Sequence, residues 1–189
     1  MVVVIRGRAV ALLLTSTAVA ACQAATPSTL PPRISSAPST AASTSKPSPA
    51  NAHDLIVKTY VAYWPILAEA GKSSPDRARE LLRPYVKGAY LDHLVDGVRK
   101  MEERNREPYG QVLPGLKEVR VGGTYAEVVD CQDVSKTAMA DRRTHVVIPG
   151  TSASRKTANI KASLERSSDG RWQLTGLSIR EAACKPPSL

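Results

Sequence analysis

The chain has 189 residues and a formal net charge of +9, and 4% of its residues are aromatic with no phenylalanine among them. This length is sufficient for one folded domain with one core. The basic side chains are dispersed and do not alternate with stacking aromatics, so the composition argues against nucleic-acid binding. A basic surface suits a place beside anionic phospholipid and wall polymers, and it suits general solubility equally well.

The N-terminal segment has the pattern of a bacterial lipoprotein signal peptide. Arg6 and Arg8 precede the apolar run 9–14, and Val19-Ala20-Ala21-Cys22 follows. Small residues directly before a cysteine fit a signal-peptidase cleft, and the Cys22 thiol can accept a thioether-linked lipid. We expect residues 1–21 to be removed and Cys22 to be lipidated, which places the protein on the extracytoplasmic face of the cell membrane. An ordinary secretory signal is the alternative. A transmembrane helix needs about 20 uninterrupted apolar residues, which the two arginines prevent.

Residues 23–50 consist almost entirely of Ala, Ser, Thr and Pro, and Arg33 and Lys46 are the charged exceptions. A segment with so few bulky apolar groups cannot offset the entropy cost of ordering, and its prolines favour an extended chain. Residues 22–50 are therefore predicted to be a lipidated cysteine and a disordered stalk. The folded domain is predicted to span 51–189.

The chain has three cysteines. With Cys22 assigned to lipid, Cys131 and Cys184 form the one remaining pair. Outside the cytoplasm such a pair should be oxidised, so the sequence predicts a Cys131–Cys184 disulfide. A redox-active cysteine is the minority interpretation, because the chain has no Cys-x-x-Cys motif.

The first part of the predicted domain has helical periodicity. Asn51 is predicted to cap a helix, and Pro65 is predicted to kink or shorten it. The apolar stripe of this helix is Ile56, Tyr60, Tyr63 and Leu67, spaced four, three and four residues apart. Ser74-Pro75-Asp76 is typical of a capped helix start, and it predicts a short helix that ends near Leu82.

A third helix is predicted at 89–104. Its predicted buried face consists of Leu91, Leu94, Val95, Val98 and Met101. Asp92, Lys100 and Glu103 are expected mainly outside this face.

The second part of the domain has the period of strands. The runs 119–121 and 126–131 flank Gly122-Gly123, which predicts a tight hairpin turn. Residues 145–148 form another apolar run, and 158–165 alternate between apolar and polar residues as in a half-buried strand. In the last strand, 172–179, the apolar residues change parity, which indicates a bulge at Gly176. Three helices followed by a strongly bent antiparallel sheet predict an α+β fold.

Four segments resemble a known family. They are Tyr63-Trp64, residues 88–94, Asp130-Cys131-Gln132-Asp133-Val134-Ser135 and Asp169-Gly170-Arg171-Trp172. Together with the helix and strand order, they resemble small secreted or lipid-anchored actinobacterial proteins with an NTF2-like (cystatin-like, SnoaL-like) fold. The resemblance implies three N-terminal helices packed on a curved sheet in a cone, and the cysteine pair fits it. This fold hosts enzymes, ligand binders and assembly modules, so it does not identify a function.

A cone of this kind leaves a cavity at its open end, where a ligand is expected. The aromatic side chains that are candidates for its lining are Tyr60, Tyr63, Trp64, Tyr85, Tyr90, Tyr125 and Trp172. The alternative is that they pack in the core, because a chain without phenylalanine must use Tyr and Trp as its large core residues.

Enzymes of this fold use an Asp or a His-Asp pair for proton abstraction next to a carbonyl. The candidates are Asp92, His93, Asp130 and His145. Adjacent helical residues point about 100° apart, so Asp92 and His93 do not easily form one dyad. Asp130 shares a strand face with Val128, which allows it to point inward. We expect no metal site and no cofactor, because no helical i,i+4 histidine pair and no thiolate cluster are present.

The favoured hypothesis is a non-enzymatic cell-surface lipoprotein that binds a small apolar or amphipathic ligand, or an envelope protein partner, through its NTF2-like domain. The anchor, the stalk, the disulfide and the lack of a catalytic constellation support it. One alternative is an enzyme of the isomerase or cyclase type that uses an inward Asp or His. Another is an accessory subunit of an envelope transporter. The oligomeric state is left open.

Overall fold

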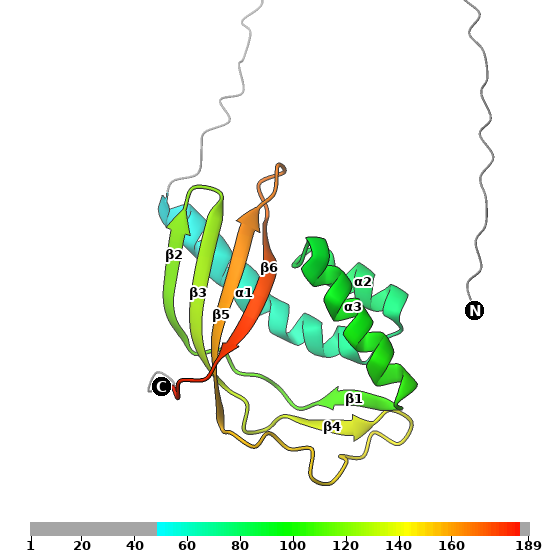
Figure 1. The fold of residues 1–189 in the computed structure, drawn as a ribbon. Helices are drawn as coiled ribbons and strands as arrows, with labels where there is room; N and C mark the ends of the chain where they lie inside the picture. Colours follow the sequence, from blue (N-terminus) through cyan, green and yellow to red (C-terminus); the bar gives the residue numbers. More distant parts are fainter. Residues whose placement is uncertain (1–48, 186–189) are drawn as a thin grey trace, which may run out of the picture. The chain divides into compact units, whose positions relative to one another are not determined.

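The computed structural model describes residues 49–185. The predicted signal peptide, Cys22 and residues 23–48 of the predicted stalk lie outside them. Three helices precede the strands (Figure 1). The helices are α1 (Pro49–Gly71), α2 (Pro75–Leu82) and α3 (Gly88–Glu103). The strands are β1 (Arg106–Tyr109), β2 (Leu116–Gly122), β3 (Tyr125–Asp133), β4 (Ala138–Asp141), β5 (Thr157–Arg166) and β6 (Trp172–Arg180).

Helix α1 begins at Pro49, before the predicted cap at Asn51, and it continues through Pro65 to Gly71. Proline suits a first helical turn, since the N–H that it lacks would have no helical partner there. The predicted apolar stripe is correct. Ile56, Tyr60 and Tyr63 are fully buried, and Leu67 is half-buried.

Helices α2 and α3 follow the predicted pattern closely. Ser74 Oγ accepts a hydrogen bond from the Arg77 N–H at 3.4 Å, and Pro75 is the first residue of α2. The predicted inner face of α3 is confirmed. Its buried members are Leu91, Val95 and Val98, and its half-buried members are Leu94 and Met101.

Strands β2, β3, β5 and β6 form the main sheet in that order, with all neighbours antiparallel. Gly122 pairs with Tyr125, so the β2–β3 turn consists of Gly123 and Thr124, one residue later than predicted. Gly123 has a φ of 66°, a left-handed conformation that glycine adopts without steric cost. The turn therefore has glycine at a position where a two-residue hairpin requires a positive φ.

The β5–β6 hairpin contains the predicted bulge, one residue before the predicted position at Gly176. Leu174 pairs with Leu164 and Gly176 pairs with Ser163, which leaves Thr175 as the extra residue of β6. A bulge of this kind bends its strand and increases the local twist. The shift of the apolar positions within 172–179 therefore corresponds to a bend in the sheet.

Strands β1 and β4 form a separate two-stranded antiparallel sheet, called the arm below. In Figure 1 the arm lies below α3 and to one side of the main sheet. Neither strand was predicted from the sequence. The strand that was predicted at 145–148 is wrong apart from one bridge between Val147 and Ala140. The reason is a side-chain turn. Asp141 Oδ1 accepts hydrogen bonds from the N–H groups of Arg143 and Thr144, at 3.0 and 2.9 Å, which ends β4.

The core lies between α1 and the main sheet. From the sheet it takes Ala126, Val128, Ala162, Leu164, Trp172 and Leu174, all buried. Tyr60 and Tyr63 both contact the Trp64 ring edge to face, with ring centroids 5.8 and 5.1 Å apart. Aromatic pairs favour this geometry, so tyrosine and tryptophan fill the space that phenylalanine fills elsewhere.

Candidate functional site

The aromatic side chains predicted to line a cavity inside the cone mostly fill it instead. Tyr60 and Tyr63 are fully buried, and Trp172 is 3% exposed. The Tyr63 hydroxyl lies 3.2 Å from that of Tyr90. Burial raises the pKa of Tyr60 and of Tyr63 above the ordinary value, so both hydroxyls stay protonated. The packing interpretation is therefore correct for these residues.

The remaining aromatic candidates are spread over the domain. Tyr125 is 63% exposed at the start of β3, and Tyr85 is half-buried after α2. Trp64 is 8% exposed and, unlike the other candidates, borders the large pocket described below. The expectation of one aromatic-lined cavity is thus corrected, because most of these rings are needed to pack α1 on the sheet.

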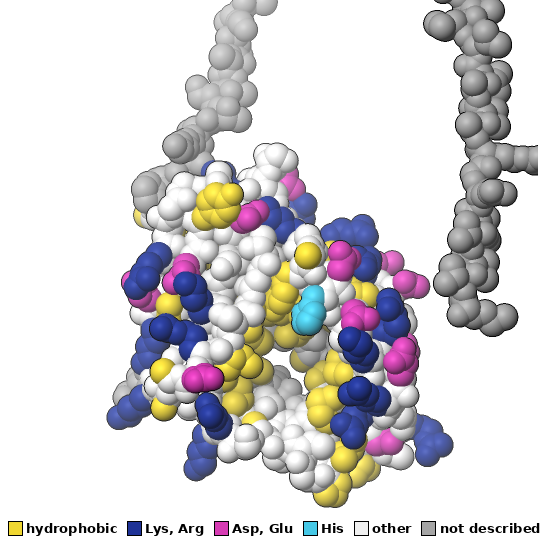
Figure 2. Space-filling model, viewed as in Figure 1, with side chains coloured by type: hydrophobic (Ala, Val, Ile, Leu, Met, Phe, Trp, Pro, Cys, Tyr) yellow, Lys and Arg dark blue, Asp and Glu magenta, His cyan; other side chains and the backbone are white. Residues whose placement is uncertain are grey.

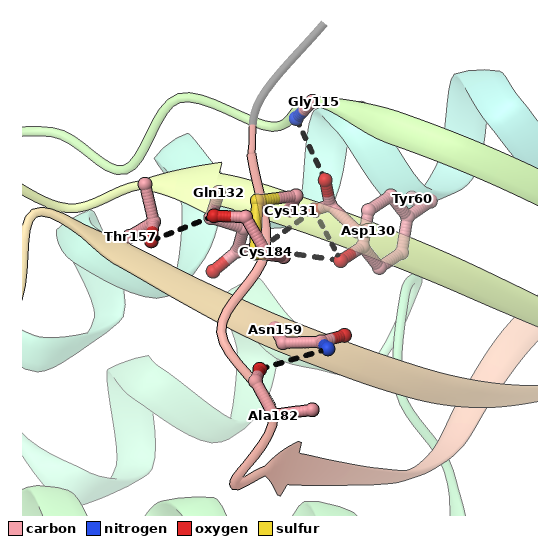
Figure 3. Close-up of a disulfide and its surroundings, with 9 residues drawn as sticks. All are labelled: Tyr60, Gly115, Asp130, Cys131, Gln132, Thr157, Asn159, Ala182 and Cys184. Atoms are coloured by element: carbon pink, nitrogen blue, oxygen red, sulfur yellow. Dashed lines mark hydrogen bonds between the residues drawn. A yellow bond between two sulfur atoms is a disulfide. The ribbon is translucent and has the colours of Figure 1, made fainter.

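Asp130 points inward from β3, as its strand face predicted, and is fully buried. Its Oδ2 accepts hydrogen bonds from the Tyr60 hydroxyl at 2.7 Å and from Gln132 Nε2 at 2.9 Å (Figure 3). Its Oδ1 accepts one from the Gly115 N–H at 2.6 Å. Both carboxylate oxygens are thus bonded to protein donors, so Asp130 is placed to join α1, β3 and the 115 loop rather than to abstract a proton from a ligand.

The predicted disulfide between Cys131 and Cys184 is present and closes a separation of 53 residues. Two further bonds hold the C-terminal segment beside it (Figure 3). Thr157 Oγ1 donates to the Cys184 carbonyl at 3.2 Å, and Asn159 Nδ2 donates to the Ala182 carbonyl at 3.1 Å. The segment after β6 is thereby attached to β3 and β5.

The other catalytic candidates lie apart from one another. Asp92 is exposed and its carboxylate accepts a hydrogen bond from Arg79 at 2.7 Å. His145 has a side chain 73% exposed, and its Nδ1 lies 2.7 Å from Glu107 Oε1, whose side chain is 5% exposed. His93, on α3, borders the large pocket. No two of the four candidates are brought together as an acid–base pair.

A pocket of about 860 Å³ lies between the helices and the arm. Figure 2 shows a hollow with hydrophobic walls in this region. Helix α1 contributes Val61, Trp64, Pro65, Leu67, Ala68 and Gly71, and α3 contributes His93, Leu94, Gly97, Val98 and Met101. The opposite wall comes from β1, β4 and their neighbouring loops, with Pro108, Tyr109, Gly110, Gln111, Val112, Pro114, Thr137, Ala138, Met139, Thr151 and Ala153. We call this the helix–arm pocket.

The pocket residues on α1 and α3 were predicted to lie on helices, but the arm wall was not predicted from the sequence. No local pattern connects residues 108–114 with 137–139 and 151–153. Their meeting depends on β1 pairing with β4, for example Pro108 with Met139. Proline and glycine in the 108–115 stretch indicate irregular backbone, but not what that backbone covers.

Within residues 49–185, no three His, Cys, Asp or Glu side chains gather as a metal site would require. None of the helices in this range combines the length and apolarity needed to cross a bilayer.

No model of a known protein family matches the sequence, and no curated protein matches it. Solved structures with a similar fold include the intermembrane-space region of the chloroplast protein ARC6, 17% identical at a TM-score of 0.49 over 71% of this chain and 97% of that chain. A ketosteroid isomerase-like protein from Erwinia carotovora atroseptica is 18% identical at 0.39, over 66% and 91%. The de novo designed NTF2 fold protein NT-9 is 14% identical at 0.31, over 70% and 88%.

These likenesses concern the fold. The predicted fold class is confirmed by the elements themselves: three helices precede a strongly bent antiparallel sheet, and α1 packs on it. The domain therefore has the predicted α+β architecture, with helices packed on a curved antiparallel sheet.

Proposed function

We propose that this domain binds a small, largely apolar ligand in the helix–arm pocket and does not catalyse a reaction on it. The observation that carries the proposal is the composition of the wall. None of the 22 lining residues is Asp, Glu, Lys or Arg, although these types make up 23% of the chain. A volume of about 860 Å³ lies within the range of known ligand pockets. Apolar walls of that size favour an apolar ligand over water.

The placement of the acids and bases supports binding over catalysis. Both carboxylate oxygens of Asp130 accept hydrogen bonds from protein donors, and Asp92 is paired with Arg79. His145 contacts Glu107 and does not border the pocket. His93 borders the pocket, but within residues 49–185 no carboxylate is hydrogen-bonded to its ring. A general base is normally held in place by such a hydrogen bond, which His93 lacks.

Gly97 allows a direct test of the pocket. It borders the pocket on α3, and a Cβ at this position would meet no atom within 4 Å. Gly97→Leu should therefore place its side chain in ligand space while it improves helix propensity by up to about 1 kcal/mol. We expect affinity for the uncharged dye N-phenyl-1-naphthylamine, followed by its fluorescence, to fall on the order of tenfold or more.

Ala89→Leu is the matched control, because Ala89 is exposed on α3 and does not border the pocket. It should bind the dye like the wild type. Equal dye affinity in the wild type and Gly97→Leu, with both variants folded by circular dichroism, would show that the pocket is not the binding site.

We also propose that the domain acts at the outer face of the cell membrane, attached through a lipid on Cys22. The pattern Val19-Ala20-Ala21-Cys22 after a basic and apolar segment supports this. Labelling of growing cells with palmitate should mark the wild type and Cys184→Ala, and should not mark Cys22→Ala. Label retained on Cys22→Ala would contradict the anchor.

A further inference from the structure

The walls of the helix–arm pocket contact one another at one apolar end. A Cβ added to Gly71, the last residue of α1, would lie 2.5 Å from Pro108 Cγ and 3.5 Å from Met101 Cε. The end of α1, the last turn of α3 and the start of the arm are therefore in contact there. All three residues border the pocket. A ligand can reach this end with apolar atoms, and a polar group placed there would lose hydrogen bonds to water.

His93 borders the pocket at its other end along α3. It precedes Met101 by eight residues, which is about 12 Å along a helix at 1.5 Å per residue. His93 is exposed, so its ring meets both the pocket and solvent. Val61, which borders the pocket from α1, is 42% exposed. The pocket therefore meets solvent on the His93 side, and it also meets solvent along the arm, where Tyr109 is 47% exposed.

The carboxylates nearest to His93 in sequence are occupied by cations. Asp92 accepts a hydrogen bond from Arg79, and Asp96 pairs with Lys100 at 2.7 Å and with Arg99 at 3.3 Å. Lys100 is the leading cause of the lowered pKa of Asp96, and the nearby His93 contributes to it through its charge.

The other two histidines each contact a carboxylate. His53 Nδ1 lies 3.4 Å from Asp54, and His145 Nδ1 lies 2.7 Å from Glu107. The His93 ring has no such contact within residues 49–185. Its nitrogens thus differ from those of His53 and His145 in being free to bond a group in the pocket.

We infer that the ligand is an elongated amphiphile that enters with its apolar end toward Gly71, Met101 and Pro108 and places one hydrogen-bonding head group at His93. This inference rests on the proposed function, because it assigns an orientation and a ligand class to the same pocket. His93 is then a positioning residue for the head group. Contact with the apolar walls provides most of the affinity. The hydrogen bond to His93 makes the pocket bind a ligand with a head group more tightly than a plain hydrocarbon.

The test compares two ligands that differ in one hydroxyl. The displacement of N-phenyl-1-naphthylamine by 1-octanol and by n-octane is measured for the wild type, for His93→Phe and for His53→Phe. Phenylalanine keeps a planar ring and removes both ring nitrogens. We expect His93→Phe to weaken 1-octanol about 3- to 10-fold, the effect of one hydrogen bond, and to leave n-octane within about twofold. His53→Phe, the same substitution away from the pocket, should change neither ligand.

The outcomes separate the two proposals. If His93→Phe weakens both ligands equally, or weakens neither while the dye is still displaced, the amphiphile inference is wrong and the binding pocket stands. If the wild type binds no dye at all, the proposed function itself is wrong. A selective loss for 1-octanol at His93 supports both.

Discussion

Asp130 shows how a buried carboxylate can have a structural role. An ionised carboxylate away from water is costly unless donors surround it. Here the Tyr60 hydroxyl, Gln132 Nε2 and the Gly115 N–H supply three hydrogen bonds. Burial and the adjacent Asp130 charge both raise the pKa of Tyr60, which keeps its hydroxyl protonated as a donor. The group joins the first helix to the strand that carries the disulfide.

Removal of the Asp130 carboxylate should destabilise the domain. Asp130→Ala leaves three donors without their acceptor, and two of them, on Tyr60 and Gln132, are buried. We expect the free energy of unfolding to fall by about 3 kcal/mol, measured by urea denaturation. Asp92→Ala removes an exposed carboxylate that pairs with Arg79, and should cost less than about 1 kcal/mol. Equal losses in the two variants would contradict the structural role of Asp130.

The arm is the element that turns a helix surface into a pocket. Arg142, directly after β4, holds it against the end of α1: Nη2 donates to the Ser73 carbonyl at 2.9 Å and Nη1 to the Gly71 carbonyl at 3.5 Å. A cation at a helix C-terminus bonds carbonyls that have no helical partner and complements the helix dipole. Nη2 also lies 3.5 Å from Glu102 Oε1 on α3. One side chain therefore links the arm to both helical walls.

Loss of the Arg142 contacts should loosen the arm selectively. In Arg142→Met we expect faster hydrogen–deuterium exchange at 106–109 and 138–141, and unchanged exchange in β3 and β5, because the main sheet does not depend on this side chain. Arg143→Met is the control, since Arg143 is exposed and its side chain makes no hydrogen bond or ion pair within residues 49–185. Arm exchange at the wild-type rate in Arg142→Met would show that the arm is held by its strand pairing alone.

The domain formed by residues 49–185 combines a helical half and a sheet half, and the Cys131–Cys184 bridge lies in the sheet half, where it links β3 to the segment after β6. On the chain-entropy model, a loop of this length removes about 4 kcal/mol of unfolded-state freedom. The bridge fixes the segment after β6 to β3. The Cys131 N–H also donates to the Gly115 carbonyl at 3.1 Å, next to Pro114 in the wall of the helix–arm pocket.

Local patterns in the sequence predicted what local forces decide. The 3- and 4-residue spacing of Ile56, Tyr60 and Tyr63 predicted the inner face of α1, because burial of a helix stripe is a periodic requirement. The parity change at Gly176 predicted the bulge, and the cysteine count predicted the one bridge. In each case the signal lies within a few residues or follows from the chemistry of one residue type.

Contacts between distant segments could not be predicted in this way. Whether Tyr60 and Trp172 line a cavity or fill it depends on how closely α1 packs on the sheet, which no local pattern contains. The Asp141 turn removed the strand expected at 145–148, and β1 instead pairs with β4 and brings Pro108 to Gly71. The sequence alone thus determined the helices, the main strands and the disulfide. The tertiary structure decided where the pocket lies, because long-range strand pairing and close packing create empty space only once the chain has folded.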